Sequence, residues 1–462
     1  MKPLSVKQIR TVLAGELIQG SDEVTVHYGA YRLKQILNKN TLFFSRKKIV
    51  NWAKLKKFFP LILVTQHEIN PPEHMNELTI IKVENTQDAY WKFVHYYRRL
   101  FQIPVIAITG TSGKTTTKEM ISHILTEDKI VTATNITSNS RTAHLQYLLK
   151  INDDTEAAIF ETAVGAPGDI INAGNYFKPT IGIITNIGAH HLNYCRSPEA
   201  YINAKGEMVD ILDQSGALII NSEDKNTKKV DLSNFHGRII TVGKNSSSNF
   251  QAKDIYYREN GMQFTMHHKN EQYIVFVPGL GEHQVYNALA AIAAANEIGI
   301  PLSSAINRIK TFQNLNHHLQ VFEGWNGSTI IDDTWSITTT SLEAGLKVLN
   351  DIGNGKKRVA IIGTLTDLGS WGYIIHKQAG EIICQIGVDI LITIGLHASI
   401  MADQVLKQDI NIQVHTFSNS PLVLDLLEKI LDENTIVLIK GDMYSQPIVE
   451  LAKKLRMTNK TL

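Results

Sequence analysis

Short apolar runs alternate with amphipathic segments along most of the chain, a pattern typical of α/β proteins. The strongest run, residues 105–109, ends in a turn that contains Gly110 and Gly113, and a segment of helical periodicity follows it. Further apolar runs predict strands at 130–134, 157–162, 181–187, 217–221 and 238–242. Helices are predicted between or after them at 118–126, 141–149, 199–212, 279–292 and 302–312. This alternation favours a doubly wound sheet.

The N-terminal and C-terminal segments show the same alternation of apolar runs and amphipathic segments over shorter lengths. The N-terminal segment predicts helices at 6–13 and 86–101 and strands at 24–27, 41–44, 60–65 and 78–83. The C-terminal segment predicts a hairpin at 319–322 and 329–332, strands at 359–363, 390–395 and 436–440, and helices at 374–386, 422–431 and 447–455. Hairpins are also expected at 263–267 and 273–277.

A chain of 462 residues is too long for one hydrophobic core. The pattern predicts three domains: a small α/β N-terminal domain at 1–103, a central P-loop doubly wound domain at 104–312, and a Rossmann-like C-terminal domain at 313–462. We expect hinges near 102–104 and 313–316, because no single domain could hold a nucleotide and all substrates.

Composition excludes several classes of protein. A net charge of +2 predicts no nucleic-acid partner, and no run of about 18 apolar residues predicts membrane insertion. Cys195 and Cys384 stand far apart without metal-binding spacing, which predicts neither a disulfide framework nor a zinc finger. We therefore expect a cytoplasmic protein, and a monomer.

The segment Gly110-Thr111-Ser112-Gly113-Lys114-Thr115-Thr116 predicts a phosphate-binding loop. Its glycines allow backbone N–H groups to approach a phosphate, Lys114 supplies a cation, and the hydroxyl of Thr115 suits Mg²⁺. The full Walker pattern would have glycine where Ile108 stands, so the match is to a shorter variant. The alternative is an ordinary strand, turn and helix with a chance Gly-Lys-Thr.

With Glu161, the Asn186-to-His191 turn, Lys205 and Asn287 in order after this loop, the chain resembles the Mur ligase family. The subgroup it resembles is the UDP-N-acetylmuramoyl-tripeptide:D-alanyl-D-alanine ligases. The resemblance implies an ADP-forming ligase that uses ATP and Mg²⁺ to activate a carboxylic acid as an acyl phosphate, which an amine then attacks. It implies small-molecule acid and amine substrates, with a UDP-muramoyl peptide as one candidate acid.

The resemblance also implies roles for individual residues. Lys114 would hold phosphate, while Thr115, Glu161 and His191 would hold metal. Lys205 matches a lysine that CO₂ carbamylates, which would turn a cation into an anion able to orient a second Mg²⁺. Taken singly, Glu161, His191 and Lys205 could each be solvated surface residues.

Three further residues are implied to contact the nucleotide: Asn287, Asp333 and His318. Asn287 matches the adenine-binding asparagine, although Gln284 replaces the family's usual asparagine beside it. Asp333 matches an aspartate of the C-terminal domain. His318 stands where the family has arginine, so a weak, pH-dependent cation replaces a permanent one.

Other expected substrate contacts are altered. Leu33-Lys34-Gln35 stands where the family's uridine-binding Asp-Ser-Arg is expected, and Thr137-Ser138 replaces an Asn-Asn pair. The segment 336–339 replaces Asn-Ala-Asn-Pro, and 440–443 replaces Lys-Gly-Ser-Arg.

Three hypotheses follow. The first is a Mur-type ligase for an altered acid and amine, the second is the housekeeping peptidoglycan ligase itself, and the third is a nucleotide-binding regulator or scaffold that has lost catalysis. The retained Lys114, Thr115, Glu161, His191 and Lys205 argue against the third, whereas His318 argues for it. A GTPase is disfavoured, because the chain has no Asn-Lys-x-Asp sequence with which to bind guanine.

Overall fold

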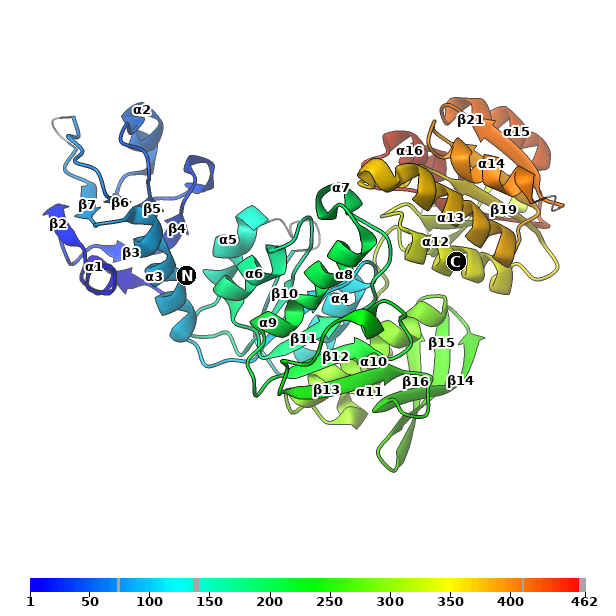
Figure 1. The fold of residues 1–462 in the computed structure, drawn as a ribbon, viewed down its shortest axis with the longest axis horizontal. Coiled ribbons are helices and arrows are strands. Elements are labelled where there is room, and N and C mark those ends of the chain that lie inside the picture. The colour runs from blue at the N-terminus through cyan, green and yellow to red at the C-terminus, as the bar shows by residue number, and fades with distance from the viewer. Residues whose placement is uncertain (73–74, 136–140, 409–410, 457–462) are drawn as a thin grey trace. The chain divides into compact units, whose positions relative to one another are not determined.

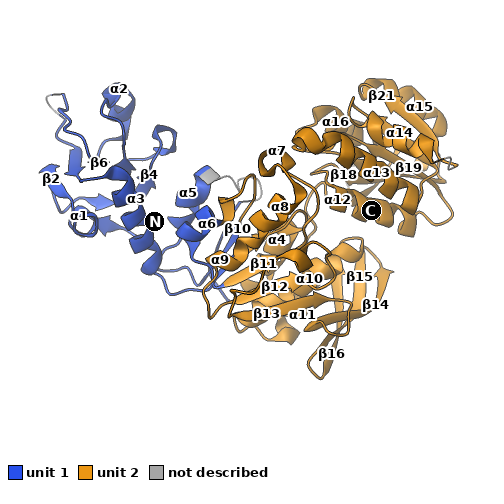
Figure 2. Cartoon of the chain, viewed as in Figure 1, with its two compact units in different colours: residues 1–107, 128–160, 171–180 blue, residues 108–127, 161–170, 181–462 orange. Residues whose placement is uncertain are grey.

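The computed structural model describes residues 1–72, 75–135, 141–408 and 411–456. It confirms the α/β class, with three larger sheets whose strands are mostly parallel (Figure 1). Contacts divide the chain into two compact units, 1–107 with 128–160 and 171–180, and the remainder (Figure 2). The three-domain division stays a prediction, although each larger sheet draws its strands from one of the three predicted ranges.

The N-terminal sheet has the strand order β2-β7-β6-β5-β4. Its strands, with the separate pair β1 and β3, are β1 Leu4–Ser5, β2 Glu16–Gln19, β3 Thr25–Val26, β4 Tyr28–Ala30, β5 Thr41–Phe44, β6 Leu61–Thr65 and β7 Leu78–Lys82. The helices are α1 Val6–Leu13, α2 Trp52–Leu55 and α3 Thr86–Arg99. Helix α1 begins as predicted, because the Ser5 side chain accepts from the backbone N–H of Gln8 and the Gln8 side chain bonds back to Ser5.

The central sheet has nine strands in the order β16-β15-β14-β13-β12-β11-β8-β10-β9. These strands are β8 Val105–Thr109, β9 Val131–Ala133, β10 Ala157–Glu161, β11 Ile181–Ile184, β12 Ala217–Asn221, β13 Arg238–Gly243, β14 Phe250–Arg258, β15 Gly261–His268 and β16 Glu271–Pro278. The helices are α4 Lys114–Leu125, α5 His144–Leu148, α6 Asp169–Phe177, α7 Leu192–Cys195, α8 Pro198–Gly206, α9 Met208–Ile211, α10 Glu282–Glu297 and α11 Leu302–Ile309. Helix α10 is buried along most of its length, as its alanine-rich sequence predicts.

The C-terminal sheet has the order β17-β18-β22-β19-β20-β21, and only the β17–β18 hairpin is antiparallel. Its elements are β17 Gln320–Glu323, β18 Thr329–Asp333, α12 Thr339–Ile352, β19 Lys357–Ile362, α13 Gly372–Ile386, β20 Ile390–Ile394, α14 Ser399–Lys407, β21 Gln413–Phe417, α15 Leu424–Ile430, β22 Thr435–Lys440 and α16 Gln446–Leu455. Val437 and Ile439 share a core with α15 and α16, whereas Leu438 points toward Gly345 of α12. Helices therefore cover both faces, as the predicted Rossmann-like arrangement requires.

Several predictions about individual elements were wrong. The single helix expected at 199–212 is two helices, α8 and α9, which are divided at Glu207 although this residue keeps helical φ and ψ values of −51° and −15°. The Glu207 carboxylate accepts from the N–H groups of Gly168 and Ile170. Helices α6, α12 and α14 and strands β14 and β21 were not predicted. In α12 the buried residues Leu342, Leu346 and Leu349 have helical spacing, which could have revealed the helix.

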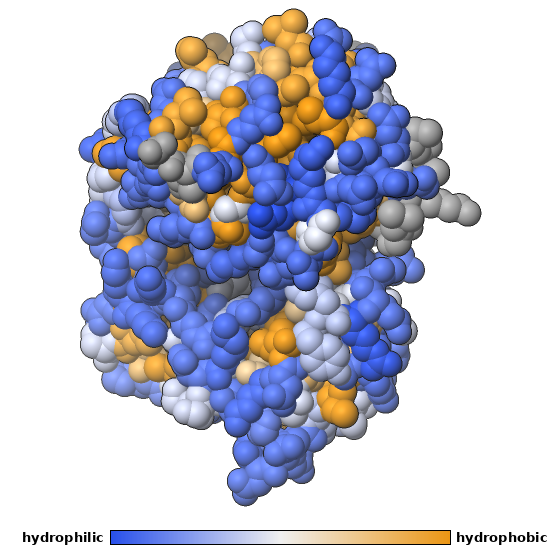
Figure 3. Space-filling view, turned by 90° about the vertical axis from the view of Figure 1, so that its right-hand side faces the viewer, coloured by the Kyte–Doolittle hydropathy of each residue, from blue (hydrophilic) through white to orange (hydrophobic). Residues whose placement is uncertain are grey.

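Among the described residues no helix is long and apolar enough to cross a bilayer. The face in Figure 3 is mostly hydrophilic, with apolar side chains gathered in its upper part. Leu396 and Leu406, two of the exposed large apolar residues of the chain, are 84% and 64% exposed. Isolated apolar residues are common on protein surfaces and indicate no partner.

Candidate active site

The predicted phosphate loop joins the end of β8 to the start of α4 and depends on its two glycines. Gly110 and Gly113 adopt φ values of 145° and 82°, which favour glycine. A Cβ atom on Gly110 would lie 1.9 Å from Oγ1 of Thr185, so no other residue fits there. Gly113 directly precedes the first residue of α4, which aims the positive end of this 12-residue helix at the loop.

The segment after β11 holds the loop in place. The backbone N–H of Thr111 donates to the carbonyl of Asn186 at 2.9 Å. The Asn186 side chain accepts from the Ser112 N–H at 3.1 Å and donates to the Ser112 carbonyl at 3.0 Å. Thr116 is buried in the first turn of α4. The loop is therefore fixed before any ligand binds, which favours tight anion binding.

Lys114 lies partly buried over the loop. Its Nζ donates to the carbonyl oxygens of Gly110 at 2.9 Å and Thr111 at 3.2 Å. Burial lowers the pKa of its ammonium, and the nearby charge of Glu161 opposes this shift. Neutral carbonyls compensate a cation poorly, so an arriving phosphate would be a stronger partner for Lys114.

Thr115 and Glu161 form a pair of oxygen donors beside the loop. Thr115 Oγ1 lies 3.3 Å from Glu161 Oε2, and Glu161 ends strand β10. The Nζ atom of Lys118, one turn further along α4, lies 3.6 Å from Glu161 Oε1 and 2.7 Å from Glu119 Oε1. A hydroxyl and a carboxylate suit Mg²⁺, so the donors present fit the metal that the family resemblance implies.

Lys205, on α8, reaches the same loop from a position 95 residues away in sequence. Its side chain is 1% exposed, and Nζ donates to the Gly110 carbonyl at 2.9 Å and to Thr109 Oγ1 at 3.3 Å. Burial, and then the charge of Lys114, hold the pKa of Lys205 well below its usual range. A lowered pKa increases the fraction of the amine in its neutral form, which is the form that reacts with CO₂.

His191 lies within range of the charges of Lys205 and Lys114, and it also contacts a residue that was not predicted, Asp367. The His191 Nδ1 lies 3.2 Å from Asp367 Oδ2, and its ring centroid lies 3.8 Å from that of His190. Burial, followed by the charges of Lys205 and Lys114, lowers the pKa of His191 to about 4. No motif pointed to Asp367, which lies 176 positions after His191 and follows a strand of another sheet.

Asn287 lies beneath the loop. A Cβ atom on Gly113 would lie 2.5 Å from Asn287 Oδ1, which also accepts from Thr117 Oγ1 at 3.3 Å. The Asn287 amide nitrogen lies 3.4 Å from Gln284 Oε1. Asn287 therefore supports the turn in this structure, and its contact with adenine stays a prediction.

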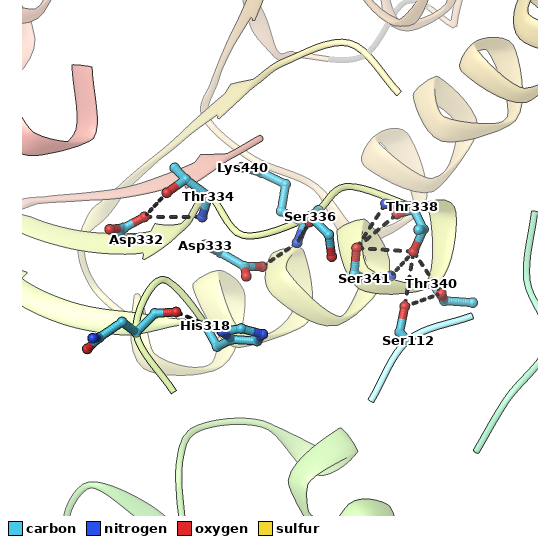
Figure 4. Close-up of polar contacts among 11 residues, drawn as sticks. Ser112, His318, Asp332, Asp333, Thr334, Ser336, Thr338, Thr340, Ser341 and Lys440 are labelled. Carbon is cyan, nitrogen blue, oxygen red and sulfur yellow. Dashed lines mark hydrogen bonds and ion pairs between the residues drawn. The ribbon is translucent and has the colours of Figure 1, made fainter. Parts of the chain in front are cut away.

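Asp333 and His318 lie in the C-terminal part of the second unit (Figure 4). Lys440 Nζ donates to Asp333 Oδ2 at 2.6 Å and to the Ser336 carbonyl at 2.7 Å. His318 Nδ1 lies 2.8 Å from the Asn316 carbonyl oxygen, and burial lowers its pKa. Asp333 is thus engaged in a buried ion pair, and its predicted contact with nucleotide is untested.

A cluster of hydroxyl groups joins the loop to the start of α12 (Figure 4). Ser112 Oγ lies 3.1 Å from Thr338 Oγ1 and 2.9 Å from Thr340 Oγ1. Thr338 is also the N-cap of α12. Thr338 was noted only within the segment that replaces Asn-Ala-Asn-Pro, Thr340 was not singled out, and the contact of both with Ser112 could not be foreseen. Thr137 and Ser138, another such departure, lie outside the described residues.

Comparison with known proteins agrees with this geometry. Residues 108–295 match the family model of the Mur ligase middle domain. The UDP-N-acetylmuramoyl-tripeptide--D-alanyl-D-alanine ligase of Bacillus subtilis is 26% identical over 443 residues, 95% of each chain. The ligase of the same name from Buchnera aphidicola (subsp. Baizongia pistaciae) is 29% identical over 384 residues, 82% of this chain and 81% of the relative.

Residues 108–295 belong to the Mur ligase middle-domain family, and the chain as a whole is similar to UDP-N-acetylmuramoyl-tripeptide--D-alanyl-D-alanine ligases. This Mur ligase is accordingly an ATP-dependent, ADP-forming enzyme that makes amide bonds. In fold it is similar to MurF from Acinetobacter baumannii, with a TM-score of 0.84, 21% identity and coverage of 98% and 100% of the two chains. It is also similar to MurF ligase from Thermotoga maritima in complex with ADP, with a TM-score of 0.75, 18% identity and coverage of 93% and 98%.

Sequence reasoning overlooked Lys118, Thr340 and Asp367, and it noted Thr338 and Lys440 only as members of altered segments. Lys118 had a usable signal, because positions three and four residues apart share a helix face and it follows Thr115 by three and Lys114 by four. Asp367 had none, since only the tertiary fold brings it to His191.

Proposed function

We propose that this Mur ligase joins a carboxylic acid other than UDP-N-acetylmuramoyl-tripeptide to an amino acid or dipeptide amine. A carboxylate oxygen of the acid attacks the γ phosphorus of ATP, and the bond to ADP breaks. The amine nitrogen then attacks the acyl carbon, phosphate leaves with the bonding electrons, and the amine loses a proton. Substrates of this kind, and the absence of a membrane-spanning helix among the described residues, support a cytoplasmic location.

The observation that supports phosphoryl transfer at this loop is that two lysine side chains donate to one carbonyl oxygen. Lys114 and Lys205 both donate to Gly110 at 2.9 Å. Charge that develops on the transferring phosphoryl group needs preorganised donors close by. We propose that Lys114 and the loop N–H groups bind the phosphates, and that Thr115 and Glu161 hold Mg²⁺, which would neutralise phosphate charge when bound.

We propose that Lys205 is carbamylated. Its neutral nitrogen attacks CO₂, a nitrogen–carbon bond forms, and the nitrogen loses a proton to give a carbamate anion. The lowered pKa supports this step, because an ammonium has no lone pair to react. The carbamate would replace a poorly compensated buried amine by an anion beside Lys114, which supplies an opposite charge.

The hydrogen bonds of Gln35 support the proposal that the acid substrate differs from UDP-N-acetylmuramoyl-tripeptide. Gln35 stands at the end of the segment where the family's uridine-binding residues are expected. Its Oε1 accepts from the N–H groups of Tyr31 and Arg32, at 3.1 and 3.0 Å. Its Nε2 donates to the Thr142 carbonyl at 2.8 Å. Internal partners therefore occupy both ends of this amide, which leaves less capacity for a uracil ring.

The housekeeping reaction is the second candidate, because the relatives that align over most of the chain carry that name. ADP release with Mg²⁺-ATP and bicarbonate separates the candidates. UDP-N-acetylmuramoyl-tripeptide plus D-alanyl-D-alanine should stimulate release little, whereas a panel of other acids should contain one that does. Strong stimulation by the named pair would establish the housekeeping reaction instead. ATP binding without turnover for any pair would favour a regulator.

Lys114→Ala tests the phosphate site. We expect turnover to fall about 100- to 1000-fold, the usual cost of losing one donor to transition-state charge. Far-UV circular dichroism should stay unchanged, since Lys114 is partly exposed and bonds only its own loop. Lys407→Ala, at an exposed position of α14, is the matched control. Unchanged ADP release by Lys114→Ala would remove the proposed role of this loop.

A further inference from the structure

We propose that residues 46–57, which we call the basic segment, form a surface that binds anionic phospholipid bilayers. The basic segment lies between β5 and β6 and includes the short helix α2 (Figure 1). Binding is peripheral and reversible, because cations and an apolar side chain supply it rather than a spanning helix. The proposal does not depend on ligase activity, and it can be tested without ATP or substrates.

Charge is distributed unevenly along the chain. Residues 24–67 contain nine lysine and arginine residues and no aspartate or glutamate. The rest of the chain contains 37 basic and 44 acidic residues, which gives it a net charge of −7. The overall charge of +2 therefore conceals one strongly cationic region. A cationic surface of this kind attracts anionic lipid headgroups.

The six cations of the basic segment are available to an external anion. All six are exposed, and none forms an ion pair with a carboxylate in the described part of the chain; they are Arg46, Lys47, Lys48, Lys54, Lys56 and Lys57. The partner of the Arg46 guanidinium is neutral, because its Nη1 donates to Gln87 Oε1 at 3.0 Å. Cations without internal counter-charges keep their full attraction for a negative surface.

An exposed apolar side chain lies among these cations. Ile49 directly follows Lys48 and is 85% exposed. Leu396 is equally exposed, yet no lysine or arginine lies within five positions of it. At an anionic bilayer the cations contact headgroups while an apolar side chain enters the boundary of the acyl chains. Duplex nucleic acid offers no such apolar layer, so Ile49 favours a bilayer as the partner.

The opposite side of the basic segment is fixed to the core of its domain. Leu55 is buried, and Trp52 packs against the same cluster, which includes Leu61 of β6. The Asn51 side chain caps α2, because its Oδ1 accepts from the N–H of Lys54 at 3.1 Å. The cations are therefore held on a folded surface, which reduces the entropy lost on binding.

Sedimentation with lipid vesicles tests the proposal in the full-length chain without a tag. The vesicles contain phosphatidylcholine alone or with an increasing fraction of phosphatidylglycerol. We expect binding to increase with the anionic fraction and to be negligible on phosphatidylcholine alone. Raising the salt from about 0.1 M to about 1 M shortens the Debye length from about 10 Å to about 3 Å, and should release most of the protein.

The first variant removes charge by combining Lys47→Gln with Lys48→Gln. Affinity for anionic vesicles should fall about 25-fold, because each cation near such a surface contributes a factor of about five. The matched control combines Lys228→Gln with Lys229→Gln, an exposed pair of neighbouring lysines outside the cationic region. The control should bind as the wild type does.

The second variant, Ile49→Ser, removes the apolar contact and leaves every charge in place. We expect affinity to fall about tenfold, since the bilayer no longer buries this side chain. Leu396→Ser is the control for an apolar residue of similar exposure. All variants should keep the wild-type Tm without vesicles, because the substituted side chains are exposed.

The proposal fails if the wild-type chain does not bind anionic vesicles, or if the Lys47 and Lys48 variant binds as tightly as its control. Displacement from the vesicles by duplex DNA at equal phosphate concentration would overturn it in favour of a general polyanion site. Displacement by excess UDP would assign the basic segment to a soluble nucleotide instead. Vesicle binding by a chain that ligates no acid would leave this surface standing while the proposed function fails.

Discussion

Lys205 and Lys440 are both 1% exposed, yet their surroundings differ in one respect. Lys205 donates to two neutral oxygens, on Gly110 and Thr109. Lys440 donates to the carboxylate of Asp333 at 2.6 Å. A buried ammonium without a strong counter-charge loses its proton readily, and the pKa of Lys205 is lowered accordingly. We therefore expect equal burial to favour reactivity at Lys205 and an ion pair at Lys440.

Lys205→Met tests whether the buried amine of Lys205 takes part in catalysis. We expect ADP release to fall by about 100- to 1000-fold, because the variant can form no carbamate. Stability to urea should change little or increase, since methionine fills similar volume without a buried polar group. The matched control is Lys407→Met. A variant that retains wild-type turnover would contradict a catalytic role for Lys205.

Lys440→Met tests whether the ion pair with Asp333 stabilises the fold. Removing one member of a buried ion pair leaves the other uncompensated and costs about 3–5 kcal/mol. Urea denaturation measures this loss of unfolding free energy. Adding Asp333→Leu to the same chain should restore most of it, because the unpaired carboxylate is then gone. If Lys440→Met is as stable as the wild type, the pair does not contribute to the fold as we infer.

His283 lies near both Asp333 and Lys440, and its protonation makes the stability of this region depend on pH. Burial lowers its pKa to about 4 from 6.5, with opposing and reinforcing charges from Asp333 and Lys440. The unfolded chain therefore binds a proton before the folded chain does, and stability falls as pH decreases from 6.5 to 4. The loss attributable to His283 is at most about 3 kcal/mol. His283→Gln should be less sensitive to acid than the wild type in urea midpoints at pH 7, 5.5 and 4.5. Equal sensitivity would show that His283 remains free to protonate in the folded chain.

Thr340→Val should have the smallest effect. It removes the hydroxyl that lies 2.9 Å from Ser112 Oγ, at the contact between the phosphate loop and α12. We expect a loss of about 1 kcal/mol, the usual net contribution of one hydrogen bond. A double-mutant cycle with Ser112→Ala measures the coupling, and Thr25→Val, at an exposed position, is the control. A coupling energy of zero would mean that the hydroxyls do not interact in solution.

Prediction from sequence succeeded where neighbouring residues decide the structure. The boundaries of α1 and β5 were predicted correctly, and β8 and its loop lie where the apolar run and glycines indicate. It missed the division of 199–212 into two helices at Glu207, where the backbone angles stay helical and no local signal marks a break. The approach of Lys205 to Gly110 needed the family resemblance, because the residue alone indicates an ordinary surface lysine.

The sequence by itself determined the class of the fold and the phosphate loop, since hydrophobic periodicity and glycine positions are local properties of the chain. Tertiary structure alone decided which charges meet. It buried Lys205 against neutral oxygens and Lys440 against Asp333, and it brought Asp367 to His191. The physical reason is that electrostatic energies depend on burial and on distance, and no spacing along the chain specifies either.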